Sequence, residues 1–175
     1  MGAGSSFYGD VLPQPEVDTL LEKALRLARI IGTRLTFYTI FSEGKMGYNE
    51  KQIGSFFKSH PGSREKVFLA TKFGNTMEFK VRGDKDYVKQ SCADSLERLG
   101  VDQIDLYYIH RKPQDVELEE TIKAMKDLQD EGKIKYIGVS EFTVEDLKRA
   151  EKVAHIDALQ IELSAWTPQV LSNGE

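Results

Sequence analysis

The sequence has a single cysteine, and this scarcity excludes two common kinds of stabilising site. With Cys92 alone, the chain can form neither an intramolecular disulfide nor a zinc site built from cysteine ligands, and we predict no metal site. Cys92 shares one face of a predicted helix with Val88, Leu96 and Leu99. That apolar setting favours a buried structural thiol over a reactive one.

The sequence also lacks long apolar runs, basic patches and the common phosphate-binding motifs. No stretch approaches the ~18 apolar residues of a membrane span. The net charge is -4 and Lys and Arg are scattered among Asp and Glu, so we expect neither nucleic acid nor a membrane as a partner. The N-terminal MGAGSSFYGD has no cationic patch and no apolar segment, which argues against a signal peptide and makes the protein cytoplasmic by expectation. Neither GxGxxG after the first predicted strand nor GxxxxGK(S/T) occurs.

Helix-like and strand-like segments alternate along the chain, which is typical of an α/β protein with a parallel sheet. Helical spacing of apolar residues covers residues 15–31, 49–59, 84–99, 117–132 and a segment from 143 onward. Asn49, Asp84 and Thr143 are the expected N-caps. Runs rich in Val, Ile, Leu and Tyr predict strands over residues 34–40, 66–72, 101–110, 134–140 and 158–162, all within one domain, 1–175.

Four of the predicted strands stop on a polar residue. The runs VFLATK, IDLYYIH, KYIGVS and ALQIE end at Lys72, His110, Ser140 and Glu162. Because the carboxyl ends of parallel strands open onto one face, we expect Lys72, His110 and Ser140 to line one active-site rim. Taken singly, the three residues have simpler interpretations as a solvated lysine, a structural histidine and a helix-capping serine.

Longer segments around these positions match a known family. The runs KVFLATKFG, SLERLGVDQIDLYYIHR and EGKIKYIGVSEF together resemble an aldo-keto reductase, and MGAGSSFYG, YNEKQIG and ALQIELSAW resemble further segments of that family. The resemblance implies a (β/α)8 TIM barrel and an oxidoreductase that moves a hydride between NADPH and a small-molecule carbonyl compound, so that aldehydes or ketones become alcohols.

The resemblance also implies roles for individual residues. Lys72 matches the family's catalytic lysine and His110 its catalytic histidine, while Ser140 and Gln160 match residues that hold the nicotinamide carboxamide. Glu141 stands where many members have Asn. In the family a tyrosine protonates the alkoxide left by hydride transfer. A nearby lysine ammonium lowers the tyrosine pKa from about 10.

The resemblance also implies an aspartate on the second strand that holds the lysine, and the sequence departs from the family where this aspartate and the tyrosine are expected. In place of a pattern like FxDTAxxYG, the chain reads TFYTIFSEGKMGYNE, which puts Thr39 at the aspartate position and Gly44 at the tyrosine position. Tyr38 falls one residue early and is expected on the opposite face of the sheet. Tyr48 lies beyond the loop and is the remaining candidate for a substitute tyrosine.

The matching segments also stop short of a whole barrel. They run from the end of the family's first strand to its sixth, so we predict an incomplete barrel of about five parallel strands, which cannot close alone. Open sheet edges would favour self-association. Three functions stay open: an active reductase that borrows Tyr48, an inactive binding or regulatory relative, and a truncated remnant. The substrate and the choice between NADPH and NADH are left open by the sequence.

Overall fold

The computed structural model describes residues 12–30, 35–38, 47–76, 80–164 and 166. Within them, one parallel sheet has the order β1-β2-β3-β4-β5, made of β1 (Leu35–Tyr38), β2 (Val67–Phe73), β3 (Ile104–Ile109), β4 (Ile134–Ser140) and β5 (Ala158–Gln160). The α-helices are α1 (Gln14–Ile30), α2 (Tyr48–Ser59), α3 (Lys85–Leu99), α4 (Leu118–Asp130) and α5 (Val144–Ala150), and a 3-10 turn, Arg64–Lys66, leads into β2. A helix separates each pair of neighbouring strands along the chain, so the sheet is built from repeated βαβ units.

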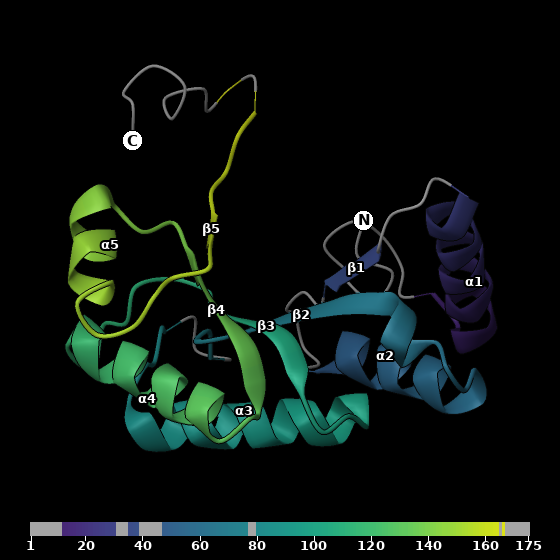
Figure 1. The fold of residues 1–175 in the computed structure, drawn as a ribbon, viewed down its shortest axis with the longest axis horizontal. Helices are drawn as coiled ribbons and strands as arrows, with labels where there is room; N and C mark the ends of the chain where they lie inside the picture. Colours follow the sequence, from purple (N-terminus) through teal and green to yellow (C-terminus); the bar gives the residue numbers. More distant parts are fainter. Residues whose placement is uncertain (1–11, 31–34, 39–46, 77–79, 165, 167–175) are drawn as a thin grey trace.

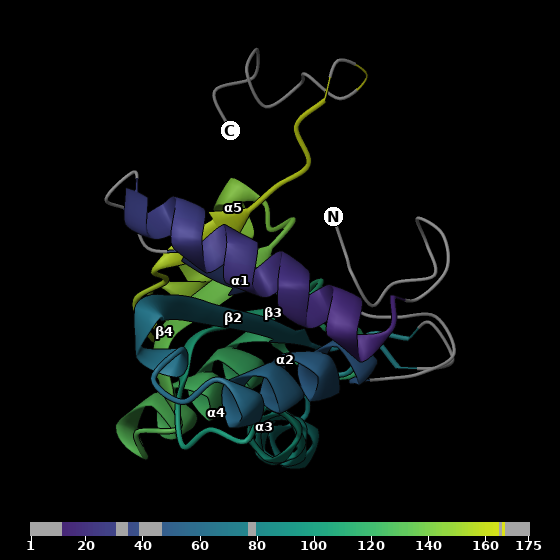
Figure 2. The ribbon, with the colours of Figure 1, turned by 90° about the vertical axis from the view of Figure 1, so that its right-hand side faces the viewer.

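The sheet is curved, and the helices lie on its outer side (Figure 1). Helix α1 lies next to α2 at the β1 end of the sheet, while α5 lies at the β5 end (Figures 1 and 2). After β5, residues 161–164 run away from the sheet (Figure 2). Helices outside and a concave inner face are the arrangement of a (β/α)8 barrel that is only partly built.

Alternate strand residues separate into two apolar layers. The layer that faces the helices forms the main core, which includes the fully buried Leu69, Tyr107 and Ile137. The concave layer is a smaller cluster of Ala70, Leu106 and Tyr108, against which Phe68, Tyr136 and Ala158 pack. Because side chains alternate along a strand, Lys72, two residues after Ala70, belongs to the concave face.

A glycine on β4 makes room for the aromatic ring on this concave face. Tyr108 and Gly138 are register partners of β3 and β4. A Cβ added at Gly138 would lie 2.5 Å from two atoms of the Tyr108 ring. Only glycine therefore leaves room for the ring at this position without displacement.

Two of the three predicted helix caps are confirmed. The Asp84 side chain accepts a hydrogen bond from the backbone N–H of Tyr87, and Thr143 forms a capping box with Asp146. The prediction that Asn49 caps α2 is wrong, because the helix begins at Tyr48 and its N-cap is Gly47 with φ 74°. Asn49 is buried inside the first turn instead.

A buried carboxylate joins three elements behind the site. Glu50 on α2 is 4 % exposed, and its Oε1 accepts a 2.6 Å hydrogen bond from the Thr71 hydroxyl on β2. Its Oε2 accepts a 2.6 Å bond from Nε of Arg98 on α3. Thr71 directly precedes Lys72, so this contact also fixes the backbone that carries the lysine.

Apolar side chains are exposed at both ends of the sheet. Leu20 and Leu27 are exposed on α1, and Leu159, Ile161, Leu163 and Trp166 are exposed on β5 and the segment that follows it. Among the described strands, β5 pairs only with β4, so within the described ranges its other edge has no partner strand. In the described ranges, no helix combines the length and the hydropathy that crossing a membrane requires.

Candidate active site

Lys72, His110, Ser140 and Gln160 lie at the carboxyl ends of four consecutive strands. Lys72 is the next-to-last residue of β2, and His110 directly follows β3. Ser140 ends β4 and Gln160 ends β5, and the two residues pair in register. Strand β5 therefore stops two residues before the predicted end at Glu162. Parallel topology places all four residues at one end of the sheet.

The Lys72 ammonium interacts across the mouth of the curved sheet. Its Nζ donates a hydrogen bond to Oε1 of Gln160, and it lies 5.8 Å from the centre of the Tyr108 ring. Burial, helped by the positive charge of Arg111, lowers the pKa of Lys72 to about 8, although the carboxylate of Glu141 acts in the opposite direction. The lysine therefore titrates much closer to neutral pH than an exposed lysine does.

His110 is held by both its backbone and its ring. Its backbone N–H donates to the carbonyl of Phe73 at 2.9 Å, and its Nδ1 lies 2.5 Å from Nδ2 of Asn75. Burial, together with the charges of Lys72 and Arg111, lowers the pKa of His110 to about 4. The imidazole is therefore neutral at physiological pH.

Ser140 is 2 % exposed and lies beneath an arginine. Nη1 of Arg111 donates to the Ser140 hydroxyl at 3.3 Å and to the carbonyl of His110 at 3.1 Å. The interpretation of Ser140 as a helix cap is wrong, because Thr143 caps α5. Ser140 is instead the last strand residue before the rim.

Glu141 turns the chain sharply at the end of β4. Its φ of 57° is in the left-handed region, which Asn adopts more readily than Glu. In this conformation its backbone N–H donates to the carbonyl of Gln160 at 2.9 Å, and its carboxylate accepts from the backbone N–H of Glu162 at 2.7 Å. The turn thus ties the end of β5 to the end of β4.

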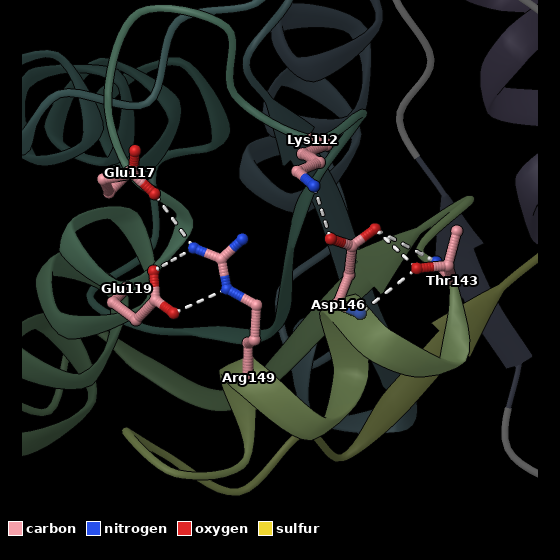
Figure 3. Close-up of polar contacts among 6 residues, drawn as sticks. All are labelled: Lys112, Glu117, Glu119, Thr143, Asp146 and Arg149. Carbon is pink, nitrogen blue, oxygen red and sulfur yellow. Dashed lines mark hydrogen bonds and ion pairs between the residues drawn. The ribbon is translucent and has the colours of Figure 1, made fainter.

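The loop after His110 is anchored on α5 by ion pairs (Figure 3). Nζ of Lys112 lies 2.5 Å from Oδ1 of Asp146, whose side chain is 8 % exposed. Burial alone would raise the pKa of Asp146, but hydrogen bonds from Lys112 and Thr143 outweigh it and lower that pKa. Farther along, Arg149 bonds Glu119 and Glu117. These contacts fix the loop that carries Arg111.

The residues at the missing family positions lie outside the described part of the chain. Thr39 and Gly44 are not among the described residues, and neither is the side chain of Tyr38, whose backbone pairs in register with Ala70. Tyr48, the alternative tyrosine, is half-buried and is the first residue of α2.

One groove lies away from the strand tips. It has a volume of about 1250 Å³ and runs between α2 and α3, where Lys58, Arg64, Glu97 and Asp102 are among its lining residues. Arg64 and Asp102 precede β2 and β3, so the groove is at the opposite end of the strands. Its charges are of both signs, and we assign no site to it. The described ranges contain no group of three or more His, Cys, Asp or Glu residues placed to hold a metal ion.

Comparison with known proteins decides the family. The model of the aldo/keto reductase family matches residues 29–173. The chain belongs to the aldo/keto reductase family. Among curated members, it is 48 % identical to aldo-keto reductase str7 of Strobilurus tenacellus over 93 % of this chain and 45 % of that protein. It is 40 % identical to a probable aldo-keto reductase of Glycine max, over 78 % of this chain and 40 % of that protein.

Solved structures of this family confirm the incomplete barrel. A thermostable aldo-keto reductase, solved in complex with the inhibitor epalrestat, superposes with a TM-score of 0.77 at 27 % identity. The match covers 99 % of this chain and 59 % of that structure. The glycerol dehydrogenase of Gluconobacter oxydans gives 0.73 at 25 % identity, over 85 % of this chain and 46 % of its own. The chain spans less than half the length of the two curated relatives.

Two polar residues of the aldo/keto reductase rim escaped the sequence analysis. Asn75 and Arg111 contact His110 and Ser140, yet Asn75 lies outside the family-matching runs and Arg111, the last residue of one of them, was given no role. The available signal was position alone, because Asn75 follows LATKFG and Arg111 follows IDLYYIH. Loop residues that directly follow strand ends in a barrel are the ones that reach its active-site face.

Proposed function

We propose that this chain forms part of an NADP(H)-dependent oxidoreductase that reduces an aldehyde or ketone to an alcohol. The observation that carries the proposal is the convergence of Lys72 and His110 at one rim, where the lysine lies close enough to lower the histidine pKa. Family membership supports the reaction class. We further propose that the isolated chain has little or no such activity.

The polar groups at the ends of β4 and β5 suit a nicotinamide carboxamide. Ser140 offers a hydroxyl and Gln160 an amide, and the register of the two strands puts them side by side. A carboxamide carries a complementary NH₂ and oxygen. NADPH would supply a hydride to the substrate carbonyl. The family's main cofactor contacts are expected in βα units beyond the matched sixth strand, so we expect weak binding by this chain.

The chemistry assigns distinct roles to the two catalytic candidates. Hydride addition to the carbonyl carbon moves the π electron pair onto oxygen, and the resulting alkoxide takes up one proton. A ring N–H of His110 would hold that oxygen, and the Lys72 ammonium would favour its developing negative charge. The family's proton donor is a tyrosine, and Gly44 stands at its position. Loss of a general acid costs about 10²–10⁴ in rate, which is why we expect low activity.

A chimera tests this assignment. We would replace the matching part of the Strobilurus tenacellus relative with this chain. The substitutions Thr39→Asp and Gly44→Tyr would then restore the family's aspartate and tyrosine, and NADPH oxidation would be followed with a simple aldehyde. We expect measurable turnover, and its loss in the further variants His110→Gln and Lys72→Met. A folded restored chimera that binds NADPH without turnover would contradict the proposed role of the rim.

A second candidate function is a binding or regulatory relative that keeps the fold without catalysis. The residues Thr39 and Gly44 favour it, because neither side chain can replace a carboxylate or a phenol. Fluorescence titration of the purified chain with NADPH tests this candidate, because tight binding without turnover supports it, whereas the first proposal expects weak binding. The cytoplasmic location stays a prediction that cell fractionation would check.

A further inference from the structure

The described parts of the loop after β2, residues 74–76 and 80–82, are hydrogen-bonded to each other, and Asn75 in the first part contacts His110. Gly74 has φ 114°, and its carbonyl accepts a 2.9 Å bond from the backbone N–H of Arg82. Asn75 and Val81 form an isolated antiparallel bridge, and the backbone N–H of Thr76 donates to the carbonyl of Lys80 at 2.9 Å. The two arms of the loop are thus joined as a short ribbon, which holds the Asn75 backbone in place.

Helix α3 adds a second anchor to this loop. The hydroxyl of Tyr87 donates to the carbonyl of Asn75 at 3.5 Å. The guanidinium of Arg82 lies 4.7 Å from the centre of the Tyr87 ring and forms an ion pair with Asp84, the N-cap of α3. Asn75 is therefore fixed from β2 on one side and from α3 on the other.

The side chain of Asn75 meets the ring of His110. An amide nitrogen carries two hydrogens and accepts none, so Nδ2 of Asn75 is the donor and Nδ1 of His110 the acceptor. A neutral imidazole has one N–H, and when Nδ1 accepts, that hydrogen is on Nε2. We propose that Asn75 is a positioning residue that fixes His110 as the Nε2–H tautomer, so that Nε2 donates to the carbonyl oxygen of the substrate. The role in reduction rests on the proposed function.

The charges around the ring explain why an amide suits this position. Lys72 from β2 and Arg111 from the loop after β3 both act on His110 as cations. Glu141, on the loop after β4, acts on Lys72. An aspartate in place of Asn75 would favour a hydrogen on Nδ1 and a charged ring. The amide selects the opposite tautomer, while burial and the two cations keep the ring neutral.

Nuclear magnetic resonance of the ¹⁵N-labelled chain tests the tautomer directly. Long-range ¹H–¹⁵N spectra distinguish a protonated from an unprotonated ring nitrogen in each of the three histidines. We expect His110 at pH 7 to have a bare Nδ1 and a protonated Nε2. His60 and His155, which lie beside Glu22 and Glu151, are references within the same chain.

Two variants separate positioning from folding. Asn75→Leu should turn the single tautomer of His110 into a mixture, and Asn75→Asp, which keeps the side-chain shape, should move the hydrogen to Nδ1 and raise the His110 pKa by about 1–3 units. Thr76→Ala, in the same loop, should change neither, and the spectra of His60 and His155 should stay constant in all variants.

Two results would overturn the proposal. One is a wild-type His110 that carries its hydrogen on Nδ1, and the other is an unchanged tautomer in both Asn75 variants. The measurement needs neither cofactor nor turnover. If the chain proves inactive, the tautomer measured for His110 is unaffected. If His110 proves to be the other tautomer, the proposed reductase function is unaffected.

Discussion

The buried ion pair behind the rim gives the sharpest stability prediction. Glu50 accepts from Thr71 and Arg98, and the side chains of Glu50 and Arg98 are 5 % and 24 % exposed. Glu50→Gln keeps an oxygen for Thr71 but sets an amide N–H against the Arg98 guanidinium. Removal of one partner from a buried pair costs about 3–5 kcal/mol, because the other charge stays buried without compensation.

Urea denaturation followed by circular dichroism measures this cost. With a slope of about 2 kcal/mol per molar urea, a loss of about 4 kcal/mol lowers the midpoint by about 2 M. A domain is stable by about 5–15 kcal/mol in total, so the variant should be close to the threshold of folding. Lys89→Gln is the matched control, because its pair with Glu131 is 36 % and 48 % exposed. An exposed pair contributes about 0–1 kcal/mol.

The double variant Glu50→Gln, Arg98→Met decides between two explanations. If the loss comes from the uncompensated guanidinium, removal of both charges should restore much of the midpoint. If it comes from general disruption of packing, the double variant should be less stable than either single one. A Glu50→Gln midpoint no lower than that of Lys89→Gln would show that the buried pair contributes no more than the exposed one.

Three further predictions concern the core, the pH dependence and the open edge. The Tyr107 hydroxyl is fully buried and has no hydrogen-bond partner within the described part, so Tyr107→Phe should raise the free energy of unfolding by about 1 kcal/mol or more in urea titrations. Because the His110 pKa is about 4 in the folded chain and 6.5 ordinarily, the unfolded chain binds the extra proton between these values. Stability should then fall as pH drops from about 6.5 to about 4, and His110→Gln should reduce that fall while His155→Gln should not. We expect the chain to self-associate through the exposed apolar residues of β5 and of the segment after it, and sedimentation should show a species larger than a monomer that Leu163→Asp shifts toward monomer. A wild-type monomer at all concentrations would contradict this.

The sheet and its polar rim could be predicted from sequence because local pattern determines both. Apolar runs with a polar last residue located the ends of β2 and β4, and their parallel order followed from the helices between them. The end of β5 could not be predicted from the end of its apolar run. Strand β4 stops at Ser140 and Glu141 turns away with φ 57°, so β5 has no ladder partner beyond Gln160, although its apolar run continues to Glu162.

The residues that the sequence analysis missed are those defined by distant contacts. Asn75 meets a residue 35 positions away, and Arg111 meets one 29 positions away. No local pattern carries such information. The wrong prediction of Asn49 as an N-cap has a different cause. The N-cap of α2 is a glycine with positive φ that makes no side-chain hydrogen bond, and such a helix start cannot be predicted from the side chains preferred at N-caps.

The contact between Lys72 and Gln160 connects the shape of the sheet to its chemistry. Strands β2 and β5 are three strand spacings apart in the sheet order, which is about 14 Å across a flat sheet. A hydrogen bond between side chains at their ends therefore requires the sheet to curve, so that the concave face narrows toward the rim. The Tyr108 ring lies beside Lys72 because the two residues are register partners of β2 and β3, and Gly138 makes room for that ring. The depressed pKa of Lys72 follows from this enclosure, since burial is its largest cause. A sheet that flattened would lose the enclosure and the altered lysine together, so barrel curvature is itself a condition for the proposed chemistry.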